Sequence, residues 1–139
     1  MNTQPIHPDY VHQIWPTVAR WLENGLVHSG GEYNIDQLKV FVQQGSHILH
    51  VFIEDGEYVG AVTVAFENYP NARIAFVSSI GGRSIADLSA LSSFSDWCRA
   101  AGCTSIRGAV RPSVARLCNK FGFDPIDVLI YDPWIEPQM

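Results

Sequence analysis

The fold-deciding stretch of this chain is RIAFVSSIGGRSIADLSALSSFSDWCRAAGCTSIRGAVR, residues 73–111. It begins with a short apolar run at residues 74–77 and continues through a turn of small residues at 78–84. A segment with helical spacing then extends to Ala101, Gly102 and Cys103 end it, and a second strand is predicted at 105–110. Two strand-sized apolar runs joined by a helical segment are typical of a β-α-β crossover, which makes the strands parallel neighbours and lays the helix across one face.

The turn at residues 78–84 is where we expect this unit to bind a ligand. Backbone N–H groups of a glycine-containing turn and of the first helical turn have no intrahelical partner, and the helix dipole adds partial positive charge there. Gly81, Gly82 and Arg83 suit the binding of a phosphate group. The structural alternatives are a plain strand-to-helix turn and an Arg83 that faces solvent.

Length and composition indicate one globular domain, residues 1–139. The chain is 47% hydrophobic and 17% charged, and its net charge is −5. No basic field is expected, so nucleic acid is not a predicted partner. The apolar runs are strand-sized, and the first residues lack the basic and apolar parts of a signal peptide, so we expect no membrane span and a cytoplasmic location. Cys98, Cys103 and Cys118 lack metal-ligand spacing, which predicts reduced thiols and no metal site.

The first half of the chain predicts two helices and a hairpin. Apolar residues at near-helical spacing mark a helix at residues 9–27, in which Pro16 predicts either a kink or two short helices. Asn34 is expected to cap a second helix that runs through Gln44 and ends at Gly45. Strands at 47–53 and 58–66 then flank Asp55-Gly56, a strong hairpin turn signal.

The last part of the chain predicts one more helix and strand. Pro112 opens a helix that Gly122 ends, and a strand follows at residues 126–131. The predicted order is therefore α-α-β-β-β-α-β-α-β. This order gives an α/β fold (α+β mixed), with a central mixed sheet and helices on both faces.

These segments together carry a resemblance to a known family. The segments that carry it are the helix containing Ile14-Trp15-Pro16, the hairpin, the strand with its glycine turn and long helix ending at residues 97–103, and the segment SVARLCNKFGF at 113–123. Together they resemble the GCN5-related N-acetyltransferase (GNAT) family, especially its short bacteriophage and prophage members. The similarity extends over about residues 11–131. It implies that the two crossover strands diverge after Val77 and open a cleft for a cofactor.

The resemblance also implies a cofactor, acetyl-CoA or coenzyme A. Its pantetheine arm and pyrophosphate would contact the strand end and the following turn, at Val77, Ser79, Gly81, Gly82, Arg83 and Ser84. A backbone N–H near residues 77–79 would polarise the thioester carbonyl. In the helix after residue 112, Cys118 stands at the place of the family's tyrosine acid, and we expect it to pack as a small buried hydrophobe.

Other candidate residues lie outside the crossover unit. Glu67 could accept a proton from a substrate amine, or it could be a solvated turn residue. His28, Glu32 and Tyr33 lie in the loop that closes over the acceptor in this family, with an ordinary surface loop as the alternative. His47 and His50 flank a strand core and are interpreted as structural histidines.

The leading functional hypothesis is N-acyl transfer, with acetyl as the expected group, from acetyl-CoA to an amine of a small molecule or a protein. A homodimer is compatible with it. The alternative is a catalytically degenerate GNAT-fold protein that serves as a binding or virion-associated phage module, because fold alone does not establish activity. A third hypothesis, modification of nucleic acid, rests on the phage-like resemblance alone.

Overall fold

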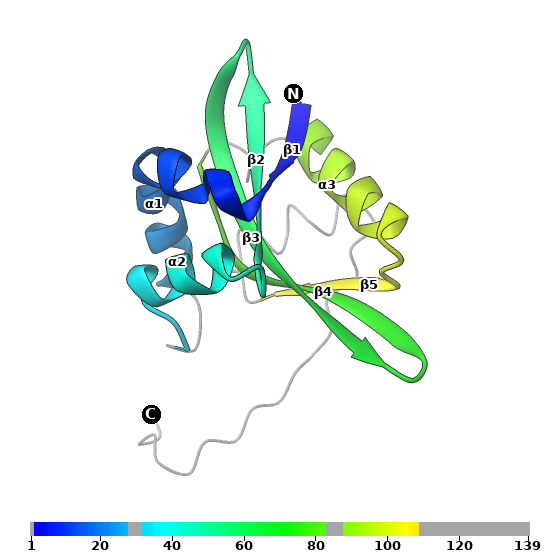
Figure 1. Cartoon of the computed structure of the whole chain (residues 1–139). Coiled ribbons are helices and arrows are strands. Elements are labelled where there is room, and N and C mark those ends of the chain that lie inside the picture. Colours follow the sequence, from blue (N-terminus) through cyan, green and yellow to red (C-terminus); the bar gives the residue numbers. More distant parts are fainter. Residues whose placement is uncertain (1, 28–31, 83–87, 109–139) are drawn as a thin grey trace, which may run out of the picture.

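The computed structural model describes residues 2–27, 32–82 and 88–108. Within them the chain forms one five-stranded mixed sheet in the order β1-β2-β3-β4-β5 (Figure 1). The strands are β1 (Asn2–Ile6), β2 (Ile48–Glu54), β3 (Glu57–Tyr69), β4 (Ala72–Gly82) and β5 (Ser105–Gly108). The helices are α1 (Val11–Leu26), α2 (Ile35–Gln43) and α3 (Leu88–Ala100), and a 3-10 turn, η1 (Pro8–Tyr10), precedes α1. The predicted fold class is confirmed.

The predicted β-α-β crossover is also confirmed. Strands β1 to β4 pair antiparallel in sequence order, whereas β4 and β5 pair parallel with α3 between them in the chain. The parallel pairs run from Ile74 opposite Ser105 to Val77 opposite Gly108. Gly108 is the last described residue of β5, so the separation of the two strands beyond Val77 stays a prediction.

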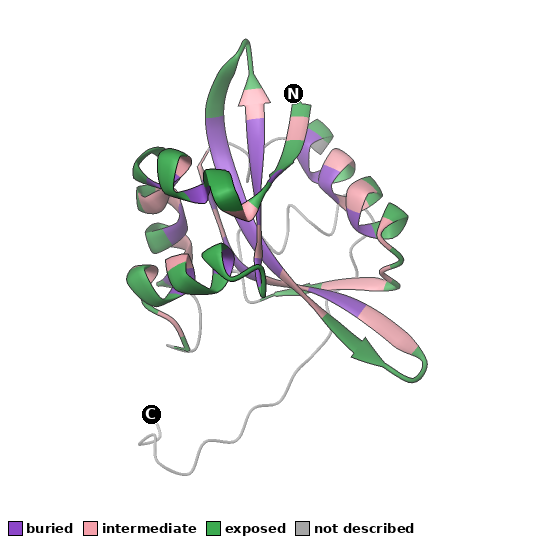
Figure 2. Ribbon diagram, in the orientation of Figure 1, coloured by how far each residue is buried: buried purple, intermediate pink, exposed green. Residues whose placement is uncertain are grey.

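Two apolar clusters lie on opposite faces of the sheet, and each is covered by helices. Figure 2 shows buried residues along the middle of the strands and on the inward sides of the helices. Buried residues of the cluster under α1 and α2 are Ile6, Val11, Trp15, Val18, Leu22, Leu26, Leu38, Val42, Leu49, Val51 and Ala61. Buried residues of the cluster under α3 are Phe52, Val59, Val62, Val64, Ala75, Ala90, Phe94 and Cys98. The sheet is therefore the middle layer of three (Figure 1).

The first residues form a strand that the sequence interpretation missed. The predicted order begins with a helix, whereas β1 pairs antiparallel with β2 from Asn2 opposite Ile53 to Ile6 opposite Leu49. Proline has no N–H to donate to a ladder. Pro5 is tolerated in β1 because this is an edge strand of the described sheet, where a backbone nitrogen can face away from the neighbouring strand. Only Ile6 of this strand is buried, so the alternation that marks a strand is weak here.

The first helix is continuous across Pro16, and the alternative of two short helices is wrong. Helix α1 runs unbroken from Val11 to Leu26 with Pro16 inside it. A proline there removes the hydrogen bond to the carbonyl of His12. Both residues are exposed, so water can satisfy that carbonyl.

Two local signals are confirmed. Asn34 caps α2 in a reciprocal capping box with Gln37, and Gly45 follows the helix with a φ of +82°. Asp55 and Gly56 join β2 to β3 with φ values of +52° and +78°, the left-handed conformations that a two-residue hairpin turn requires.

The glycine turn predicted at residues 78–84 is wrong over its first five residues. Strand β4 continues to Gly82, and Ser79, Gly81 and Gly82 pair with β3 residues Thr63, Ala61 and Gly60. Pairing with β3 outweighs the turn preference of glycine here. The helix and strand predicted after residue 111 lie outside the described residues.

Candidate functional site

Strand β4 contains a β-bulge at Ser78. On β3, Thr63 lies opposite Ser79 and the next residue, Val64, lies opposite Val77, so Ser78 is an extra residue without a partner on β3. A bulge interrupts the hydrogen-bond ladder and re-aims the side chains around it. As a result, Ser78 and Ser79 both direct their hydroxyls to the face that carries α1 and α2. The Ser79 hydroxyl donates a 2.6 Å hydrogen bond to the backbone carbonyl of Leu22 in α1.

The Ser78 hydroxyl is the centre of a buried polar cluster. It lies 3.0 Å from Nδ1 of His47 and 2.7 Å from Oγ1 of Thr63, and it donates to the backbone carbonyl oxygen of Thr63 at 3.2 Å. All three residues are buried. Burial lowers the pKa of His47 below its ordinary value of 6.5, so the imidazole is neutral at neutral pH.

Two aromatic rings lie against His47. The ring centroid of Tyr33 is 5.3 Å from that of His47 in an edge-on arrangement, and that of Phe41 is 5.6 Å away. Tyr33 and Phe41 contact each other edge-on at 5.5 Å. The structure thus brings Tyr33, a predicted substrate residue, next to the bulge through His47. We call Tyr33, Phe41, His47 and Ser78 the bulge cluster.

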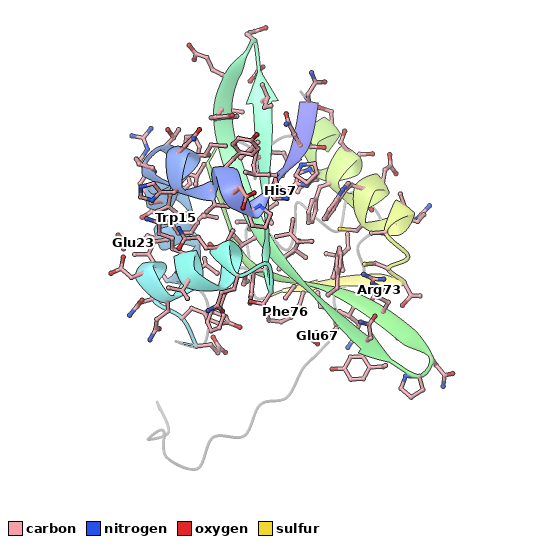
Figure 3. The ribbon with its side chains drawn as sticks, in the orientation of Figure 1. His7, Trp15, Glu23, Glu67, Arg73 and Phe76 are labelled. Atoms are coloured by element: carbon pink, nitrogen blue, oxygen red, sulfur yellow. The ribbon has the colours of Figure 1, made fainter. Side chains whose placement is uncertain are left out.

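The other acceptor-side candidates are not in this cluster. Glu32 is exposed beside Tyr33, and His28 lies outside the described residues. Glu67 is exposed near the end of β3, where the Tyr69 hydroxyl donates to its carboxylate at 3.2 Å. In Figure 3, Glu67 and Phe76 lie toward the β3–β4 hairpin, away from α1.

Glu67 nevertheless shares a sheet face with the bulge cluster. The neighbouring Phe66 ring contacts Trp97 of α3, so strand alternation places Glu67 on the opposite face, the one to which Thr63 also points. Glu67 lies four positions beyond Thr63, which is about 13 Å along a strand. This separation is too large for Glu67 to contact a group bound at the bulge directly.

The two glycines predicted to bind phosphate have structural explanations within the sheet. A Cβ on Gly81 would overlap the backbone carbonyl of Trp21 in α1. Gly82 has a φ of +86°, and a Cβ there would lie 2.5 Å from the carbonyl oxygen of Val59. Val77 is half-buried in the cluster under α3, whereas Arg83 and Ser84 lie outside the described residues. The cofactor roles of these residues remain predictions.

The second interpreted histidine, His50, is a core residue on the other face. It is fully buried, with its ring 4.7 Å from that of Trp97 and 5.4 Å from that of Phe94, and neither ring nitrogen has a hydrogen-bond partner among the described residues. Burial lowers its pKa to about 4. His50 is therefore neutral at neutral pH, in keeping with a structural role.

Sequence interpretation missed Ser78 and Thr63 as site residues and treated His47 as structural. The bulge depends on the register between two strands, and no local sequence pattern marks it. Within the described ranges, no three His, Cys, Asp or Glu residues gather as a metal site, and no helix there is both long and apolar enough to cross a membrane.

Comparisons with known proteins identify the fold. No protein-family model matches the sequence, and no curated protein is detectably similar to it. Among solved structures, a probable acetyltransferase matches with a TM-score of 0.71 at 10% identity, over 99% of this chain and 100% of the other. Ribosomal-protein-alanine N-acetyltransferase from Brucella melitensis matches with a TM-score of 0.63 at 14% identity, over 97% and 100%. Glucosamine-6-phosphate N-acetyltransferase from Arabidopsis thaliana matches with a TM-score of 0.61 at 9% identity, over 96% and 98%.

These matches cover both chains almost completely, so the likeness extends over a whole domain. Their low identities show the fold and leave the substrate open. Within the described residues, the predicted order from the first helix to the strand at 105–108 is present, with the parallel pair at β4 and β5. The chain therefore has the fold of GNAT-type acetyltransferases.

Proposed function

We propose that this protein transfers an acetyl group from acetyl-CoA to an amine. The observation that carries the proposal is the bulge at Ser78, which interrupts β4 one residue beyond the last described parallel pair with β5 in an acetyltransferase fold. A bulge leaves backbone groups outside the ladder. An N–H freed there would stabilise the negative charge that develops on the thioester oxygen during attack.

The edge of β4 beyond Val77 suits the cofactor. In the described part of the chain, no strand pairs with β4 after Val77 on the β5 side. Extended ligands can add to such an edge through amide hydrogen bonds, as a peptide does to a sheet. When bound, acetyl-CoA supplies the activated acyl group. Val77, Ser79, Gly81, Gly82, Arg83 and Ser84 are the residues that would hold it.

The acceptor would approach from the face that carries the bulge cluster. Tyr33 and Phe41 offer ring surface at that face, and the exposed carboxylates of Glu32 and Glu67 favour the approach of an ammonium group. In this proposal Glu67 attracts the amine and orients it through water. His28 stays a candidate for acceptor contact. Catalysis is then mainly positioning of the amine nitrogen against the thioester carbon.

The proposal also includes the protein's location, origin and acceptor. An amine-modifying enzyme that uses acetyl-CoA would act in the cytoplasm, where the cofactor occurs, and its origin would be among the phage-type members. A homodimer is compatible with it. The acceptor is a small molecule or a protein, and the test panel takes glucosamine 6-phosphate and a peptide with an N-terminal alanine from the two named relatives.

Thermal unfolding with and without ligand tests the proposal. A ligand present at 100 times its dissociation constant adds about 2.7 kcal/mol to the free energy of unfolding. For a chain of this size, that raises the melting temperature by roughly 5–10 °C. ATP at the same concentration is the control, since it carries phosphates but no pantetheine. An unchanged melting temperature in millimolar acetyl-CoA would contradict the proposed function, and stabilisation without transfer to any amine would favour the binding-module alternative.

A further inference from the structure

The hydrogen bonds of the bulge cluster assign the tautomer of His47. Ser78 has one hydroxyl proton, and its oxygen contacts three groups: Nδ1 of His47, Oγ1 of Thr63 and the backbone carbonyl oxygen of Thr63. A carbonyl oxygen can only accept, so the arrangement that satisfies all three contacts directs the Ser78 proton to it. The Ser78 oxygen then accepts from the other two. Only the imidazole with its proton on Nδ1 satisfies all three contacts.

An Nδ1–H imidazole has its basic lone pair on Nε2. Which ring nitrogen is basic is set by the hydrogen bond that the other nitrogen makes. Ser78 fixes the first nitrogen, while Tyr33 and Phe41 pack against the ring and fix its plane. The histidine is therefore held in one tautomer and one orientation, at the residue where β4 bulges.

We propose that His47 is the general base of the reaction and accepts the proton of the acceptor amine at Nε2, with Ser78 as its positioning residue. This inference rests on the proposed function. The nitrogen lone pair of the amine forms the new N–C bond, the C–S bond of the thioester breaks, and the N–H proton passes to Nε2. The imidazolium then releases that proton to water, and the expelled thiolate takes one proton from water.

His47 suits this task better than Glu67. Its hydrogen bond to Ser78 places it at the bulge, whereas Glu67 lies about 13 Å away along the sheet. A general base must come within hydrogen-bond reach of the proton, directly or through one water. The neutral imidazole is also the form that can accept a proton.

The charged groups near the imidazole can be named for the described residues. Among these, Tyr33 is a titratable residue in ring contact with it. Asp36 of α2, Glu32 of the preceding loop and Glu67 of β3 are exposed carboxylates on neighbouring elements, and Lys39 of α2 contacts His12. Because the carboxylates are exposed, their effect on His47 is screened by solvent and weakens with salt.

Nitrogen NMR of the histidine rings tests the tautomer without any substrate. At pH 7.5 we expect the His47 resonances of the parent protein to show a protonated Nδ1 and an unprotonated Nε2. In Ser78→Ala the acceptor of the Nδ1–H bond is lost, and the signals should shift toward the mixture of free histidine. His12, whose Nδ1 accepts from Nζ of Lys39 at 3.3 Å, serves as the internal reference for the opposite tautomer. A parent His47 that carries its proton on Nε2 would overturn the inference.

Steady-state kinetics test whether His47 is the general base. The variant His47→Asn keeps a side-chain N–H that can reach Ser78 and lacks the basic nitrogen. We expect its kcat to fall by about a hundredfold or more, with KM values within about threefold of the parent. The kcat of the parent should fall toward low pH with a midpoint below 6.5, the ordinary value of the histidine pKa. This fall should be absent from the variant. The matched control is His12→Asn, which should match the parent.

The kinetic results distinguish a failure of the His47 assignment from a failure of the proposed function. If the parent transfers acetyl groups and His47→Asn does so equally well, the assignment of His47 as the general base is wrong, and the proposed acetyltransferase function remains supported. If the parent binds acetyl-CoA but transfers to no amine of the panel, or fails to bind it, the proposed function fails and the base fails with it.

Discussion

The hydroxyl of Ser79 in β4 donates a 2.6 Å hydrogen bond to the backbone carbonyl oxygen of Leu22 in α1. The helix can approach the strand this closely because both elements carry glycine at the contact. Gly25 lies next to Ser79 and Ile80, and Gly81 lies next to the backbone of Trp21. The last turns of α1 therefore hold β4 in place immediately beyond its bulge.

Substituting Gly25 with alanine should destabilise the protein. An added Cβ would overlap the Ser79 hydroxyl and lie 2.5 Å from the carbonyl oxygen of Ile80. Overpacking of this kind costs roughly 1–3 kcal/mol, which exceeds the gain of about 1 kcal/mol from replacing glycine in a helix. Urea denaturation of Gly25→Ala measures the difference. Asn24→Ala, at an exposed neighbouring position, is the control, and equal stability of the two variants would refute the close contact.

Acid should destabilise the protein through His50. Its pKa is about 4 in the folded protein and near 6.5 when exposed, so below pH 6.5 the unfolded state takes up a proton that the folded state does not. Stability is therefore fully present above pH 6.5 and falls as the pH drops toward 4, by up to roughly 3 kcal/mol from this residue.

The variant His50→Leu isolates that effect. Leucine cannot titrate, and it removes two ring nitrogens that lack a partner in the part of the chain that the structure describes. The decline in the free energy of unfolding between pH 7 and pH 4.5 should therefore be shallower than in the parent. Guanidinium denaturation at the two pH values measures it. His47 acts in the same direction in both proteins, because burial lowers its pKa as well. Identical pH dependence in parent and variant would show that His50 is not the buried neutral group described above.

The cap of α2 should contribute to stability. The Asn34 side chain accepts a 2.8 Å hydrogen bond from the backbone N–H of Gln37, and the Gln37 side chain accepts a 3.0 Å bond in return. Removing the cap with Asn34→Ala should cost about 1 kcal/mol, whereas Asn34→Ser should restore most of it because serine caps equally well. Thermal unfolding of the pair provides the comparison. A serine variant as unstable as the alanine variant would contradict the capping role.

Neutralising Glu67 should weaken binding of the acceptor amine more than it slows the chemical step. If Glu67 attracts the ammonium form of the acceptor, Glu67→Gln should raise KM for the amine by roughly three- to tenfold at low salt and leave kcat within about threefold. The effect should shrink as ionic strength rises. Glu57→Gln, at the opposite hairpin of β3, is the control. A hundredfold fall in kcat would instead make Glu67 the base and displace His47.

Local chemistry explains which parts of the fold could be predicted from the sequence. The Asp55-Gly56 turn and the Asn34 cap depend on residues within a few positions of each other, so their signals are complete in the sequence. The crossover could be predicted because its two strands and its helix have different hydrophobic periods. Strand β1 was missed because an edge strand with one buried residue lacks that period.

The candidate site was predicted only in part because it depends on register. Tyr33 was a predicted substrate residue, whereas His47 and Ser78 are 31 residues apart in sequence and meet only when β2, β3 and β4 pair with a bulge. Gly81 and Gly82 suggested a phosphate turn, and the structure places them in a strand against Trp21 and Val59. Close approach of backbones demands glycine as strongly as a turn does, and the sequence does not distinguish the two.

The most direct measurement of the central claim is acetyl transfer itself, followed by mass spectrometry of the amine. Thiol reagents are unsuitable, because the chain has three cysteines and Cys103 is only half-buried. The protein is incubated with acetyl-CoA and each of four amines: glucosamine 6-phosphate, an alanine-initiated peptide, tyramine and spermidine. We predict that at least one gains one acetyl group in proportion to enzyme and time, and more slowly with His47→Asn. A protein that is stabilised by acetyl-CoA yet acetylates none of the four would contradict the account.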